Sequence, residues 1–117
     1  MIYLNNAATT KDKPPEVFEA VKEFILNNNV SPGRGADKLS VEADSILTGA
    51  RFSVARLFNA EDPRQIVFTL NCSDAINTAI KGVLKSGDHV LITSIEHNSV
   101  VRPLRFLEKQ GIEVEVV

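Results

Sequence analysis

The sequence predicts an α/β fold, because its second half alternates short apolar runs with helical patterns. Residues 66–70, 90–93 and 112–117 are strand-like runs rich in Val, Ile and Leu. Between them, residues 76–84 and 101–107 carry apolar side chains at helical spacing. Parallel strands need a crossover connection, usually a helix, and such crossovers are right-handed. We therefore expect three parallel strands joined by two helices.

The first half of the chain predicts two further helices. A proline pair within residues 13–16 marks the start of the first, and its apolar periodicity ends at residues 27–29. Residues 30–37 contain two glycines and a proline without periodicity, which favours an irregular loop. From Ser40, the predicted N-cap, apolar residues recur every three or four positions as far as Phe58.

Composition limits the class of protein and its partners. The chain has 117 residues, of which 44% are hydrophobic and 24% charged, as in an ordinary globular protein. Its net charge of −2, without a basic run, argues against nucleic acid or an anionic membrane as a partner. No apolar stretch reaches the ~20 residues that span a bilayer, and the first residues do not resemble a signal peptide. We therefore expect a cytoplasmic location.

Cys72 is the single cysteine, so no internal disulfide can form. The chain has two histidines, and their spacing from Cys72 does not match a zinc site. We expect no bound metal.

The first polar turn after a strand-like run is a candidate anion site. Asn71, Cys72 and Ser73 place successive backbone amides at the start of a predicted helix. Free N–H groups and the positive end of the helix dipole attract an anion, for which phosphate is the natural occupant. The Ser73 hydroxyl would be another donor. The alternative is that Ser73 only caps the helix and Asp74 favours its first turn.

The second polar turn contains a histidine. His97 lies just beyond the strand-like run at residues 90–93. Its flat ring could stack on a planar heteroaromatic cofactor, and its nitrogens could relay a proton near neutral pH. The alternative is a solvated or capping residue.

Four segments together resemble one protein family. Residues 3–10 (YLNNAATT), 32–35 (PGRG), 66–69 (IVFT) and 96–104 (EHNSVVRPL) resemble the class V aminotransferases, and among them the cysteine desulfurases and selenocysteine lyases. The resemblance implies a pyridoxal 5'-phosphate enzyme that removes sulfur from cysteine, or selenium from selenocysteine, and leaves alanine. It also implies that residues 1–117 are the N-terminal portion of an aspartate aminotransferase-like large domain. In that portion residues 1–39 form a helix and loop arm, and residues 40–117 a helix followed by a βαβαβ unit.

The resemblance assigns roles to residues of both turns. Ser73 matches a ligand of the cofactor phosphate, in a turn with Asn71 and with Cys72, which contributes its backbone amide. His97 matches the histidine that stacks on the pyridine ring and can relay a proton. The family takes sulfur onto a cysteine in the C-terminal part of the chain, so Cys72 is not that acceptor.

The resemblance also concerns the first forty residues. Ala7, Ala8 and Thr9 match a segment on the substrate side, and the loop around Arg34 matches one near the dimer interface. The sequence departs from the family where Asn5, Ser31 and Asp37 stand for Asp, Asn and His, and within residues 71–74. These small polar changes leave the substrate open.

The family's remaining functional groups have no match in this sequence. They are the lysine that binds the cofactor covalently, the aspartate at the pyridine nitrogen, the arginine for the substrate carboxylate and the sulfur-accepting cysteine. We therefore expect an N-terminal fragment that is inactive alone. In the family's sheet the first strand lies at one end and the next two at the other, so we also expect unpaired edges and exposed apolar helix faces.

The partners implied are an amino acid substrate, a second copy of the full-length chain and a sulfur-accepting protein. Two other functions stay open: another class V aminotransferase, acting on a small amino acid, and a non-catalytic phosphate-binding or interaction module.

Overall fold

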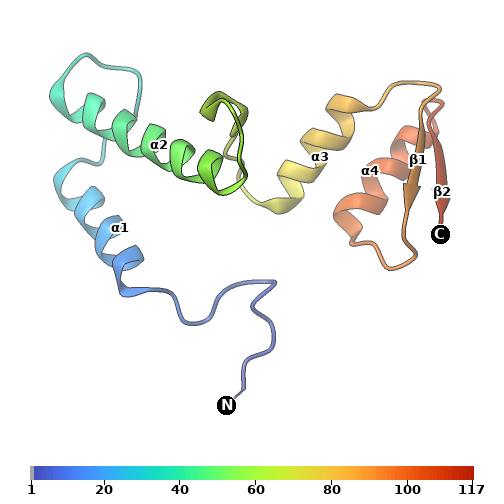
Figure 1. Ribbon diagram of the computed structural model, residues 1–117, viewed down its shortest axis with the longest axis horizontal. Helices are drawn as coiled ribbons and strands as arrows, with labels where there is room; N and C mark the ends of the chain where they lie inside the picture. The colour runs from blue at the N-terminus through green and yellow to red at the C-terminus, as the bar shows by residue number, and fades with distance from the viewer. Residues whose placement is uncertain (1) are drawn as a thin grey trace. The chain divides into compact units, whose positions relative to one another are not determined.

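The computed structural model describes residues 2–117, which form two compact units, one ending at Ile66 and one running from Val67 to Val117 (Figure 1). The first unit contains α1 (Pro15–Asn27), α2 (Lys38–Leu57) and the short 3₁₀ helix η1 (Pro63–Gln65). The second contains α3 (Cys72–Val83), β1 (His89–Ile92), α4 (Asn98–Glu108) and β2 (Glu113–Val116). The sequence-based boundary after residue 39 stays a prediction.

Helix α1 has the bounds that the sequence predicts. Pro15 occupies its first position, where a missing N–H costs nothing. At its end the amide of Asn28 donates to the Phe24 carbonyl, and Asn29 adopts a positive φ of 42° that helical backbone cannot continue.

Helix α2 begins earlier than predicted, because Asp37 rather than Ser40 is its N-cap. Asp37 Oδ1 accepts from the Ser40 amide at 3.1 Å, and the Ser40 hydroxyl donates to Asp37 Oδ2 at 2.7 Å. Both residue types favour the cap position. The carboxylate takes that role because it accepts from both Ser40 groups at once, and Ser40 is then buried inside the helix.

The second unit is built on a parallel strand pair. β1 pairs with β2 from His89 opposite Glu113 to Ile92 opposite Val116, and α4 is the crossover between them. Helix α4 contacts both α3 and β2. Its buried Leu104 and Leu107 form a small core with two side chains of the strand region, Ile92 and Ile112.

The α/β class with a parallel sheet is confirmed, but the expectation of three strands is wrong in one respect. Residues 66–69 have no regular secondary structure and Leu70 lies in a bend. A strand requires a hydrogen-bonded neighbour, and within residues 2–117 none pairs with this segment. Its apolar side chains therefore stay outside the core, with Val67 74% and Leu70 89% exposed.

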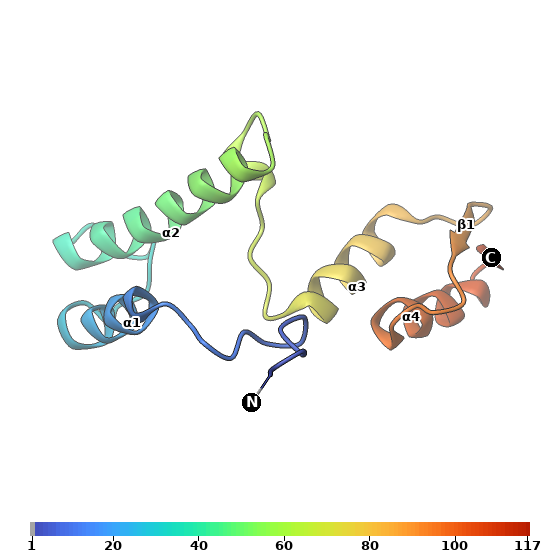
Figure 2. The ribbon, with the colours of Figure 1, turned by 60° about the horizontal axis from the view of Figure 1, so that its bottom comes forward.

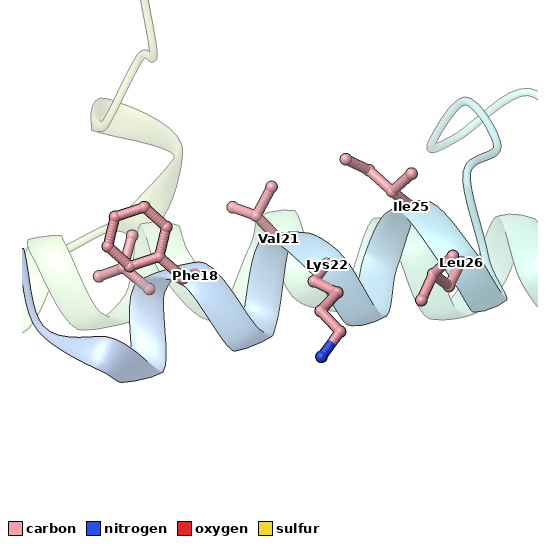
Figure 3. A pocket seen from close by; sticks show the side chains of 6 residues that line it. Phe18, Val21, Lys22, Ile25 and Leu26 are labelled. Carbon is pink, nitrogen blue, oxygen red and sulfur yellow. The ribbon is translucent and has the colours of Figure 1, made fainter.

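Exposed apolar helix faces were expected from an incomplete sheet, and α1 has one. Figure 3 shows Phe18, Val21, Ile25 and Leu26 along this helix, where with Val17 and Lys22 they line a shallow apolar groove. Phe18 is 61% and Leu26 71% exposed. Within the described residues, α1 thus keeps its apolar stripe largely in contact with water.

The Asp37 cap makes the stability of α2 depend on pH in the acid range. The hydroxyl and amide of Ser40 donate to the Asp37 carboxylate and hold its pKa below the ordinary value. A depressed folded-state pKa contributes stability above the unfolded pKa, near pH 4, and the contribution disappears as pH falls through the folded value. We expect helix content, measured by circular dichroism, to fall more between pH 4 and 2 in the parent chain than in Asp37→Asn. Asparagine is a cap that does not titrate. Identical acid profiles for the two chains would contradict this.

Candidate anion site at two helix N-termini

The N-terminal turn of α3 has free amide groups. Asn71 is the N-cap, and its Oδ1 accepts from the Asp74 amide at 2.9 Å. Within residues 2–117 the amides of Cys72 and Ser73 have no hydrogen-bond acceptor. All three residues of the predicted phosphate turn are exposed, so the positive end of the α3 dipole faces solvent. The alternative in which Ser73 caps the helix is wrong, since Asn71 takes that role and the Ser73 hydroxyl makes no capping bond.

His97 is the N-cap of α4. Its Nδ1 lies 3.1 Å from the Ser99 amide, which donates to it, and 2.9 Å from the Ser99 hydroxyl. The capping alternative for this histidine is therefore confirmed. The residue is exposed, and Nε2 makes no hydrogen bond within the described chain. Capping uses only Nδ1, so the ring faces and Nε2 are left for another partner.

The two helix N-termini meet. Ser73 and Ser99 occupy the second position of α3 and α4, and their hydroxyl oxygens lie 2.5 Å apart. The Asn77 side-chain amide bridges the two helices, since Nδ2 donates to the carbonyl of Ser73 at 2.9 Å and of Ser99 at 3.2 Å. Figure 2 shows these ends of α3 and α4 adjacent to each other. The candidate site thus lies wholly within the second unit.

A proline explains why Asn77 can reach α4. Pro103 lies inside this helix, four residues after Ser99. Proline has no N–H, so the Ser99 carbonyl loses its helical partner. The Asn77 amide supplies the missing donor from the neighbouring helix. The hydrogen bond that is missing within α4 is therefore replaced by one between α3 and α4.

Sequence reasoning missed Asn77 and Ser99 as parts of this site. Ser73 and Ser99 are 26 residues apart, and no local pattern indicates that their hydroxyls meet. One signal was present, since Pro103 within a helical pattern leaves the Ser99 carbonyl in need of a donor. Asn77 is the nearby polar residue one turn into α3.

The residues predicted for the substrate side lie in the other unit. Ala8 and Thr9 donate their amides to the Asn5 carbonyl, and the Tyr3 hydroxyl donates to the Thr9 carbonyl at 3.0 Å, which closes an exposed turn around Ala7. Arg34 is exposed in the loop between α1 and α2. The structure describes the two units separately, so the roles of these four residues stay predictions.

The positive potential of the site comes from backbone dipoles and neutral donors, and the Asp74 carboxylate in the first turn of α3 opposes it. Resolved pKa shifts occur elsewhere: besides Asp37, the Arg64 guanidinium lowers the pKa of Asp62, and that carboxylate raises the pKa of Arg64.

Cys72 is a free, exposed thiol. No group of three or more metal-binding side chains lies among residues 2–117, and no helix there is long and apolar enough to cross a membrane.

These donors fit a phosphate group. The Cys72 and Ser73 amides and the Ser73 hydroxyl can each donate to an anionic oxygen, and two positive helix ends add their field. The like ends of two helices also repel one another, and a bound anion would relieve that repulsion. The fold and the site therefore define an α/β protein with a candidate anion site next to an exposed imidazole.

Comparison with known proteins gives the family. The chain belongs to the class V aminotransferases, since the model of that family matches residues 2–117. A probable cysteine desulfurase of Methanothermobacter thermautotrophicus is 39% identical over 117 residues, which are 99% of this chain and 29% of the relative. A probable cysteine desulfurase of Synechocystis is 39% identical over 107 residues, 88% of this chain and 25% of the relative.

Solved structures show the same likeness. The apo cysteine desulfurase of Thermococcus onnurineus matches with a TM-score of 0.85 and 32% identity, over 99% of this chain and 30% of that one. A NifS-like protein matches with a TM-score of 0.80 and 27% identity, over 96% of this chain and 31% of that one. The chain thus spans about 30% of the length of these proteins.

The Asn77 bridge should contribute measurably to the stability of the second unit. Asn77→Ala leaves the Ser99 carbonyl without a donor, which we expect to lower the free energy of unfolding by about 2 kcal/mol. Pro103→Ala restores a backbone N–H that can donate to that carbonyl within α4. The double variant should therefore recover part of the loss, as measured by urea denaturation followed by circular dichroism. Strictly additive effects of the two substitutions would show that the bridge does not replace the missing helical bond.

Proposed function

We propose that this chain carries the phosphate and ring contacts of a pyridoxal 5'-phosphate enzyme that removes sulfur from cysteine, or selenium from selenocysteine, and leaves alanine. The observation that supports it is the meeting of the α3 and α4 N-termini at Ser73 and Ser99 beside the His97 ring. The family and the cysteine desulfurase relatives support the reaction class.

The phosphate contact falls to the start of α3. The amides of Cys72 and Ser73 point out of the helix end that Asn71 caps, and Ser73 adds a hydroxyl donor. Together they can hold a phosphate without a charged side chain. Asn71 acts as the positioning residue of this turn, because its own bond to the Asp74 amide fixes the first turn of the helix.

His97 is proposed as the ring platform and proton relay. Its capping bond to the Ser99 amide holds the imidazole at the start of α4. An aromatic ring in this position can stack on a planar pyridine, and its free Nε2 can hold or move a proton. When bound, pyridoxal phosphate supplies an electron sink that weakens bonds at the substrate's Cα.

The rest of the proposal extends beyond this chain. Because the chain spans about 30% of the length of its relatives, the cofactor-binding lysine, the pyridine-nitrogen partner and the sulfur acceptor would belong to other segments of such an enzyme. We propose Ala7, Ala8 and Thr9 on the substrate side and Arg34 near a homodimer interface. The homodimer, the sulfur-accepting protein, the cytoplasmic location and inactivity of the 117 residues alone stay predictions.

The phosphate contact can be tested on the chain itself. We expect pyridoxal phosphate to bind more tightly than pyridoxal, as measured by calorimetry, because pyridoxal has no anion for the α3 turn. Ser73→Ala should weaken pyridoxal phosphate binding about tenfold or more, the loss of one hydrogen bond to a charged group. Ser73→Thr keeps the hydroxyl and should retain affinity. Equal binding of pyridoxal and pyridoxal phosphate would overturn the proposed anion site.

The reaction is tested on the protein encoded by the complete reading frame that contains this sequence. We expect cysteine to yield alanine and, with a thiol reductant, sulfide in equal amounts. His97→Ala should lower the rate of alanine formation about 100-fold or more if the imidazole moves a proton. Amino-group transfer to a keto acid without sulfide would instead support the aminotransferase alternative. Phosphate binding with neither reaction would support a non-catalytic module.

A further inference from the structure

The Ser99 hydroxyl lies between two residues of the proposed cofactor site. Its oxygen is 2.5 Å from Ser73 Oγ and 2.9 Å from His97 Nδ1. The backbone of the same residue donates its amide to His97 Nδ1 and accepts from Asn77. Ser99 thus contacts the phosphate turn of α3 and the cap of α4 at once.

The direction of these hydrogen bonds follows from the chemistry of the donors. A backbone N–H can only donate, so His97 Nδ1 accepts from the Ser99 amide and carries no proton. The Ser99 hydroxyl must then donate to the same nitrogen. A hydroxyl has one proton, so the short contact with Ser73 requires Ser73 to be the donor. The chain therefore runs from Ser73 to Ser99 to His97.

We propose that Ser99 is a positioning residue that holds His97 in its Nε2–H form and links the ring to the Ser73 hydroxyl. The tautomer of His97 does not depend on the proposed function. Only the role of that tautomer, which is to present one defined imidazole to the cofactor, rests on it. Two donors on Nδ1 place the ring proton on Nε2, the nitrogen that faces away from the cap. If the ring proton could exchange between the two nitrogens, Nε2 would be a donor in one tautomer and an acceptor in the other.

The link has a consequence for anion binding. In the free chain the Ser73 hydroxyl donates to Ser99 Oγ. A phosphate oxygen that binds in the turn must therefore replace Ser99 as the acceptor of this hydrogen bond. The Ser99 hydroxyl can then turn toward Ser73 Oγ, and His97 Nδ1 keeps only the amide donor. Anion binding at the phosphate turn therefore changes the hydrogen bonding of His97 Nδ1.

The tautomer of His97 can be measured without ligand. Long-range proton–nitrogen NMR of the ¹⁵N-histidine-labelled chain at about pH 8.5 separates the two neutral forms. His89→Gln assigns the signals, because the chain has two histidines. We expect the Nε2–H form in the parent chain. Ser99→Ala should lower the ratio of Nε2–H to Nδ1–H about fivefold, the effect of one lost hydrogen bond.

Two variants separate this role from a general loss of structure. Ser99→Thr keeps the hydroxyl and should restore the parent ratio. Ser94→Ala removes a hydroxyl from the loop that precedes α4. That hydroxyl makes no hydrogen bond within residues 2–117, so its removal should leave the ratio unchanged. A parent chain in the Nδ1–H form, or an unchanged ratio in Ser99→Ala, would overturn the proposal.

Adding pyridoxal phosphate separates this proposal from the proposed function. We expect the Nδ1 signal of the parent chain to shift on binding, and to shift less in Ser99→Ala. An equal shift in both chains would contradict the link through Ser99. If the cofactor fails to perturb the Cys72 and Ser73 amides of the parent, the proposed function fails, while the tautomer ratios of the free chains still decide the role of Ser99.

Discussion

The second unit depends on one constraint, which is that α3 and α4 begin at the same place. Like helix ends carry like partial charges, so bringing them together costs electrostatic free energy. The Ser73 and Ser99 hydroxyl pair and the Asn77 bridge offset that cost with hydrogen bonds between the helices. The position of α4 in turn determines the crossover from β1 to β2, and with it the buried Leu104 and Leu107.

The Asn77 bridge exists because α4 is imperfect. An unbroken helix would bond the Ser99 carbonyl to its own backbone and leave Asn77 without that acceptor. Pro103 removes the internal donor, and the free carbonyl is then satisfied by the neighbouring helix. The same proline is buried, so its ring contributes apolar burial while its missing N–H removes one hydrogen bond from the helix. A residue that weakens one helix thus connects two.

Periodicity predicts the parts of this fold that local sequence determines. The bounds of α1, the two paired strands and the crossover helix all follow from spacing and from proline or glycine at the ends. Interactions over longer distances are different. Asp37 rather than Ser40 is the N-cap because its carboxylate accepts from both the amide and the hydroxyl of Ser40. Residues 66–70 have the pattern of a strand, but a strand also needs a partner from a distant part of a chain, and a local pattern cannot show whether that partner is present. The contact between Ser73 and Ser99 joins residues that only the assembled unit brings together.

The two interpretations of His97 are compatible, because they use different parts of the ring. The helix needs an acceptor at its N-cap, and Nδ1 provides it in the ring plane. The proposed stacking would use the faces of the ring, and the proposed proton transfer would use Nε2, which makes no hydrogen bond within the described residues. A serine or aspartate cap would satisfy α4 equally well but would leave nothing for a planar cofactor. Capping also removes rotational freedom from the imidazole, so the interaction that stabilises the helix is the one that orients the ring.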